Sequence, residues 1–115
     1  MLHQHIDLSY LERLYKGDRA RMVQWIRMYL EETPDYFRKL SHCLITGDAA
    51  GLAAAAHDLR PQAHYVGASR MLELLIAIGQ KAHGSGTEAC ADLVDEIMSL
   101  SHVVDTELRS VIKVG

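Results

Sequence analysis

The sequence has few cysteines, which cross-link a chain, and few prolines, which interrupt helices: two of each among 115 residues. It also has only one tryptophan and one phenylalanine. Cys43 and Cys90 lie far apart and have no framework spacing, so we expect buried free thiols in a reducing compartment. The scarcity of proline and a hydrophobic content of 49% argue against disorder. We therefore expect a single globular domain over residues 1–115.

Long apolar runs and an excess of positive charge are also absent. Uninterrupted apolar runs such as residues 74–78 are far shorter than the ~20 residues of a membrane-spanning helix. No basic region leads into an apolar stretch at the N-terminus, so we expect no signal peptide and a cytoplasmic location. A formal net charge of −3 argues against a nucleic-acid-binding protein, which usually carries a basic face.

What the chain does contain is helical periodicity from about residue 7 to residue 112. Glycine followed by aspartate, at residues 17–18 and 47–48, combines a helix stop with an N-cap for the next helix. We expect a short first helix with Leu8, Leu11, Leu14 and Tyr15 on one face, followed by helices at about 19–46, 49–66, 69–83 and 87–112. Because every connection is short, the fold class is expected to be all-α: an up-and-down antiparallel four-helix bundle with a short additional N-terminal helix.

Local signals refine two of these helices. A capping box formed by Ser9 and Glu12 can start the first helix, with Asp7 as an alternative cap. The apolar stripe of the segment 19–46 keeps its register through Pro34, which favours one long kinked helix over two.

The segment 49–66 holds the main functional candidate. Its buried stripe is predicted to consist of Leu52, Ala55, Ala56, Leu59, Ala63 and Val66. His57 lies about 150° from the centre of this stripe, next to Ala53, Arg60 and His64, and is therefore expected to face solvent. Because Ala53 and Ala54 are small, a partner protein can approach the imidazole closely.

This arrangement suits phosphoryl transfer. A neutral imidazole nitrogen near pH 7 is a competent nucleophile, and the phosphoryl oxygens require nearby cations. Arg60, one turn after His57, can supply this charge. Pro61 removes the N–H that would bond to the carbonyl of His57, so a kink is expected at the turn of the histidine.

Residues 56–61, Ala-His-Asp-Leu-Arg-Pro, with a glycine at position 67, resemble the signature of histidine-containing phosphotransfer (HPt) domains, approximately Ala-His-x-Leu-Lys-Gly. The resemblance extends along the chain through Asp7-Leu8, the two Gly-Asp turns, Gly67-Ala68 and the leucine-rich run 71–78. It implies that His57 is a phosphoacceptor in a two-component phosphorelay. It also implies partners that are receiver domains, and possibly a hybrid histidine kinase, with Mg²⁺ brought by the receiver and no cofactor bound by this chain.

The sequence departs from the family pattern around the histidine. The family lysine is replaced by Arg60, the following glycine by Pro61, and a usually small residue by His64, which can crowd His57 or contact a phosphoryl oxygen. The Glu or Gln that orients the imidazole in the family matches Gly79, with Gln80 one residue away. Which side chain orients His57 is left open at this point.

Structural interpretations compete with functional ones elsewhere. Leu72 and Ile76 are either a second buried side of their helix or part of an apolar docking patch beside His57. A metal site at His57 and His64, or at His3 and His5 on a mobile terminus, has little support from the spacing. Three other histidines are interpreted as incidental, Trp25 as a residue of the core or its edge, and five acidic residues as the solvated face of the last helix. The histidines are His42, His83 and His102, and the acidic residues are Asp92, Asp95, Glu96, Asp105 and Glu107.

The sequence as a whole favours a phosphocarrier that accepts a phosphoryl group on His57 and has no autokinase activity, since no glycine-rich phosphate loop is present. We expect a monomer that binds neither nucleic acid nor membrane. The alternative is an HPt-like interaction module that binds a receiver or a kinase without being phosphorylated.

Overall fold

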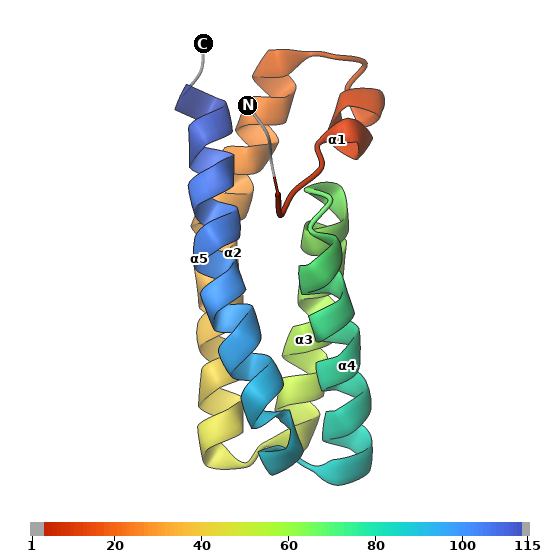
Figure 1. Ribbon diagram of the computed structural model, residues 1–115, viewed down its shortest axis with the longest axis vertical. Coiled ribbons are helices and arrows are strands. Elements are labelled where there is room, and N and C mark those ends of the chain that lie inside the picture. Colours follow the sequence, from red (N-terminus) through yellow and green to blue (C-terminus); the bar gives the residue numbers. More distant parts are fainter. Residues whose placement is uncertain (1–3, 114–115) are drawn as a thin grey trace.

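The computed structural model describes residues 4–113, and over this range the regular structure is helical. The elements are α1 (Ser9–Leu14), α2 (Arg19–Thr46), α3 (Ala49–Tyr65), α4 (Ser69–Ser85), a 3₁₀ turn η1 (Glu88–Cys90) and α5 (Ala91–Lys113). Four long helices run up and down as an antiparallel bundle, in which α2 contacts α3 and α5, and α4 contacts α3 and α5 (Figure 1). The expected fold class is confirmed.

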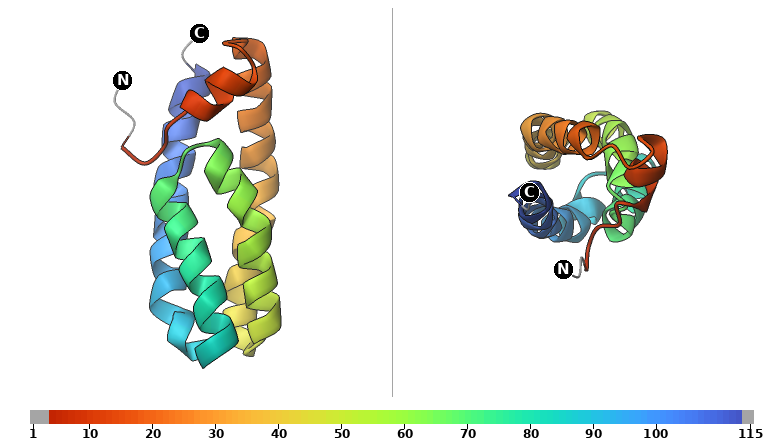
Figure 2. Two further views of the ribbon diagram at one scale, coloured as in Figure 1. Left: turned by 90° about the vertical axis from the view of Figure 1, so that its right-hand side faces the viewer. Right: turned by 90° about the horizontal axis from the view of Figure 1, so that it is seen from above.

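The short helix α1 lies across the end of the α3–α4 pair, beside the first turns of α2 (Figures 1 and 2). The chain just before it is tied to the α3–α4 connection, because the backbone N–H of Asp7 donates to the carbonyl oxygen of Val66 at 3.0 Å. Gly67 sits at this contact with φ +63°, and a Cβ there would overlap the Asp7 carbonyl oxygen. This glycine is therefore required both by its backbone conformation and by the close approach.

The two Gly-Asp pairs separate consecutive helices, as expected. The carboxylate of Asp18 accepts a hydrogen bond from the N–H of Arg21 at 3.3 Å, and that of Asp48 accepts one from Gly51 at 2.8 Å. Gly47 ends α2 in the left-handed conformation with φ +75°. Helix α2 runs without interruption through Pro34, which confirms one helix in place of two.

Several local expectations were wrong. Ser9 does not cap α1, which begins after Leu8; its N–H and hydroxyl instead donate to the carboxylate of Asp7. Leu14, expected on the apolar face of this helix, is exposed. Helix α4 continues two residues beyond the expected end and stops before Gly86, which has φ +82°. The last segment begins with the 3₁₀ turn, so the α-helix proper starts at Ala91.

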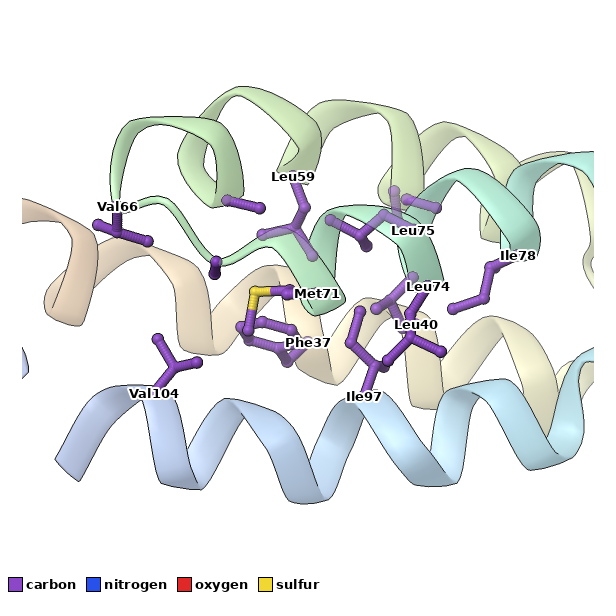
Figure 3. Close-up of a cluster of buried hydrophobic side chains, with 14 of the residues drawn as sticks. Phe37, Leu40, Leu59, Val66, Met71, Leu74, Leu75, Ile78, Ile97 and Val104 are labelled. Carbon is purple, nitrogen blue, oxygen red and sulfur yellow. The ribbon is translucent and has the colours of Figure 1, made fainter. Parts of the chain in front are cut away.

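The core is mainly aliphatic and lies between all four long helices (Figure 3). The predicted stripe of α3 is buried at every position. In the close-up, Leu59 of α3 and Leu75 of α4 lie between these two helices, while Met71 and Leu74 of α4 lie nearer to Phe37 and Ile97. Both cysteines are free and buried, and burial raises the pKa of each thiol, which disfavours the reactive thiolate. Trp25 belongs to the buried core, as expected.

The acidic face of the last helix is only partly as expected. Asp92, Asp95 and Glu96 are exposed, but Asp105 and Glu107 are half-buried. Glu107 accepts hydrogen bonds from the backbone N–H of His5 at 3.0 Å and pairs with the His5 ring at 2.5 Å. His5 is thus held against α5 and is not a mobile terminal residue, while His3 lies outside the described residues.

Candidate functional site

An open groove of about 310 Å³ runs between α3 and α4 and contains His57. One wall is formed by Ala53, His57 and Arg60 of α3, and the other by Leu75, Ile76, Gly79, Gln80 and His83 of α4. The buried faces of the same two helices fix these walls, because Leu59 and Leu75 anchor α3 and α4 in the core (Figure 3). Tight packing of an alanine-rich helix against its neighbour thus positions the groove at the surface.

His57 projects from the middle of α3 and is exposed, which confirms the expectation from the helical projection. Arg60 follows one turn later on the same wall and is exposed as well. Within residues 4–113, neither side chain makes a hydrogen bond or an ion pair. The imidazole and the guanidinium are therefore both available to an incoming group.

The groove has a positive electrostatic character. Arg60 supplies a permanent positive charge, and no carboxylate belongs to the described residues that line the groove. Asp58 is adjacent to His57 in sequence and exposed, but it is not part of the lining. An anionic group placed beside His57 would meet a cation without meeting a like charge.

The opposite wall replaces the expected orienting side chain with open space. Gly79 lines the groove, and a Cβ added there would meet no atom within 4 Å. Gln80, one residue later, also lines the groove and is exposed. The structure therefore brings Gln80 to the same groove as His57, while the position that matches the family's Glu or Gln contributes no side chain.

The remaining predicted residues are distributed unevenly around the site. Ala53, predicted as part of the surface that a partner approaches, is buried at the base of the groove. Ala54 and Pro61 are exposed and lie outside the groove lining. Leu72 and Ile76 are half-buried, and only Ile76 of the two lines the groove.

His64 shares the outer face of α3 with His57 but has different neighbours. Its ring lies 4.6 Å from the ring of Tyr10 in α1 and 6.0 Å from that of Tyr65, centroid to centroid. It does not line the groove. The structure thus places His64 in an aromatic cluster beneath α1 and not beside the His57 imidazole.

Sequence reasoning missed His83, which was interpreted as incidental and lines the groove from α4. A signal existed: His83 is four residues after Gly79 and seven after Ile76, so a helical projection places all three on one face. A larger hollow of about 800 Å³ lies along the first half of α2, but its lining contains no histidine.

Residues 4–113 bring no three His, Cys, Asp or Glu side chains together in a group suited to a metal ion. None of the helices within the described range combines the length and the apolar character that a bilayer crossing requires.

Comparison with known proteins gives one match. The family model of the Hpt domain matches residues 24–112, from within α2 to the end of α5. No curated protein and no solved structure matches. Because the match covers most of the chain, the chain belongs to the Hpt domain family, which carries a phosphotransfer role in two-component signalling and whose members typically interact with receiver domains and kinases.

Proposed function

We propose that this member of the Hpt domain family is a phosphohistidine carrier, in which His57 accepts a phosphoryl group from a receiver-domain aspartate and passes it to another receiver. The observation that carries the proposal is the groove: an exposed imidazole without a hydrogen-bond partner beside a guanidinium, with no carboxylate among the described lining residues. A family whose role is phosphotransfer requires such a nucleophile and such a charge.

The proposed chemistry is a simple displacement. The unprotonated nitrogen of the His57 ring attacks the phosphorus of an aspartyl phosphate, so that an N–P bond forms as the P–O bond to the aspartate breaks. The carboxylate leaves with the bonding electron pair, and the other ring nitrogen keeps its proton. The guanidinium of Arg60 binds phosphoryl oxygens from the α3 wall, and the Mg²⁺ of the reaction belongs to the receiver partner.

The surface around the groove suits a protein partner. Ala54 and Pro61 are exposed on α3, and Ile76 and Leu72 add partly exposed apolar area on α4. In this proposal the protein is a monomer, and a receiver docks over these residues. The buried Ala53 forms the base of the groove and does not contact the receiver. Gln80 is the polar side chain of α4 that is placed to contact the imidazole or the phosphoryl group.

A labelling experiment tests the proposal. The protein is incubated with receivers charged by acetyl phosphate, and we look for label that is acid-labile and base-stable. We expect a His57→Gln variant of unchanged helicity to lose the label completely, because no nucleophile remains at the attacking position. The control His42→Gln, on the exposed side of α2, is expected to keep it. Label that persists in His57→Gln would refute the assignment.

A second candidate is an interaction module that binds a receiver or a kinase without being phosphorylated. The observation that favours it is Gly79, which leaves open space where the family's orienting side chain would stand. Binding of a charged receiver, measured by calorimetry, without any transfer of label would support this function. Transfer to His57 would exclude it.

A further inference from the structure

A second histidine, His83, lines the groove from the wall opposite His57. It lies near the end of α4 and is exposed, and within residues 4–113 its ring makes no hydrogen bond or ion pair. One turn before it, Gly79 has no side chain, and the space above that glycine is empty to 4 Å. The α4 wall therefore has no side chain at Gly79, one turn before His83, in the groove that His83 shares with His57.

If His83 is left aside, only the α3 wall of the groove carries a positive charge. The α3 wall has the permanent charge of Arg60, whereas the α4 wall otherwise presents apolar residues, a glycine and the neutral Gln80. A phosphoryl group carries about two negative charges near neutral pH and has three oxygens that accept hydrogen bonds. Arg60 alone reaches such a group from one side, which leaves the side towards α4 without a cationic donor.

We propose that His83 binds the phosphoryl group carried on His57, with its ring N–H donating to a phosphoryl oxygen from α4 while Arg60 donates from α3. The inference rests on the proposed function, since it concerns the phosphorylated form of His57. His83 then acts as a clamp that strengthens when its ring is protonated, because a charged donor forms the stronger hydrogen bond to an anion.

Protonation makes this clamp dependent on pH, since histidine is the side chain that changes charge between about pH 5 and pH 8. The titratable and charged groups that line the groove with His83 are His57 and Arg60. The neighbouring elements also carry charges, which lie outside the groove lining: Lys81 on α4, Glu88 on η1, and Asp92, Asp95 and Glu96 on α5. Of these, Glu96 already pairs with Arg70. The phosphoryl group is therefore the main negative charge that His83 meets within the groove.

The test uses the whole protein labelled with phosphoramidate, a small donor that phosphorylates histidine without a partner protein. The half-life of phospho-His57 is measured at pH 6.5 and pH 8.5 in the unmodified protein, in His83→Gln, in His83→Arg and in the control His42→Gln. The labelled residue is mapped by mass spectrometry. The ring of His83 is titrated by NMR before and after labelling.

We expect His83→Gln to shorten the half-life about three- to tenfold at pH 6.5 and to have a smaller effect at pH 8.5, because histidine side chains lose their charge as the pH rises above neutrality. His83→Arg should keep the long half-life at both pH values, and His42→Gln should behave as the unmodified protein. The titration midpoint of His83 should rise on labelling. A merely structural role for His83 would give the same ratio of half-lives at both pH values.

The outcomes separate this inference from the function on which it rests. Normal labelling of His57 with an unchanged half-life in His83→Gln, and with an unmoved midpoint, overturns the inference alone. Label mapped to His83 also overturns it, because His83 would then be an acceptor and not a clamp. Failure of the unmodified protein to accept label from phosphoramidate and from charged receivers contradicts the proposed function itself.

Discussion

His57 and His64 lie seven residues apart on the same outer face of α3, and both are exposed, but the structure gives them different surroundings. His57 stands in a groove against α4, and within the described residues its ring has no partner. His64 lies against the ring of Tyr10, which comes from α1. A helical projection treats the two residues alike, because it contains only their own helix. The elements packed beside each residue make one an accessible imidazole and the other part of an aromatic cluster.

The difference follows from where α1 and the N-terminal segment lie. They cover the end of the bundle where α3 joins α4, and they leave the middle of these helices open (Figure 1). Contacts at the covered end are specific: Asp7 to Val66, Gly67 against Asp7, and His5 to Glu107. The covered end is thus built for stability and the open groove for access, and substitutions at the two places should have different consequences.

The largest expected effect is at the covered end. Gly67→Ala places a Cβ on the Asp7 carbonyl oxygen and forces alanine to φ +63°, so we expect a loss of about 2–3 kcal/mol in the free energy of unfolding. Urea denaturation measures it. The matched control is Gly47→Ala, which has a similar positive φ but nothing within 4 Å, and should cost about 1 kcal/mol. Equal losses would show that the N-terminal segment does not press on Gly67.

At the groove, the expected effect is on transfer and not on stability. Arg60→Gln removes the proposed charged hydrogen bond to the phosphoryl group, worth about 1.5–3 kcal/mol, and should slow labelling of His57 by about 10- to 100-fold. Arg60→Lys keeps the charge and should lose less. Because Arg60 is exposed, the urea midpoint should hardly move. A normal rate in Arg60→Gln would remove the guanidinium from the mechanism.

A smaller effect is expected where α1 meets α3. Tyr10→Ala removes ring contacts with His64 and with Tyr65, the latter at 5.1 Å, and should cost about 1 kcal/mol of stability. The NMR signals of the His64 ring should shift, while those of His57 should not. Tyr36→Ala, another half-buried tyrosine outside this cluster, is the control and should leave both histidine signals in place. An equal shift at His57 would show that the two regions are coupled.

The smallest expected effect concerns Asp105, a half-buried carboxylate of α5. Burial raises the pKa of Asp105, against the opposing influence of Arg109 and His102, and its Oδ1 atom has no hydrogen-bond partner among the described residues. A raised pKa means that the folded protein binds this proton more tightly than the unfolded chain does. Ionisation of Asp105 therefore lowers the free energy of unfolding as the pH rises from the ordinary pKa of aspartate through the raised pKa of the folded protein. Asp105→Asn should therefore stabilise the protein by about 0.5–1 kcal/mol at pH 7.

The pH dependence checks this prediction. The gain from Asp105→Asn should shrink as the pH falls towards the raised pKa, because the wild-type carboxyl then becomes neutral as well. The control Asp95→Asn, on the exposed side of α5, should change stability by less than about 0.5 kcal/mol at any pH. A gain that is independent of pH would mean that the charge of Asp105 is not the cause.

Residues that report on a single helix were predictable. The stripe of α3, the exposure of His57 and the caps at Asp18 and Asp48 depend on periodicity and local hydrogen bonds, which sequence alone specifies. Residues whose role depends on a neighbouring helix were not. Ala53 was predicted as part of the surface that a partner approaches and is buried at the base of the groove, and His83 was interpreted as incidental and lines the groove.

By itself, the sequence determined the helices, their antiparallel order and the outward-facing position of His57 on the alanine-rich helix. Helical spacing of apolar residues and the glycine stops carry this information locally. Only the tertiary structure decided what surrounds that histidine: Gln80, His83 and the open space at Gly79 across the groove, and α1 beside His64. These neighbours are set by how one helix packs against another, and the spacing of residues within a single helix does not contain that information.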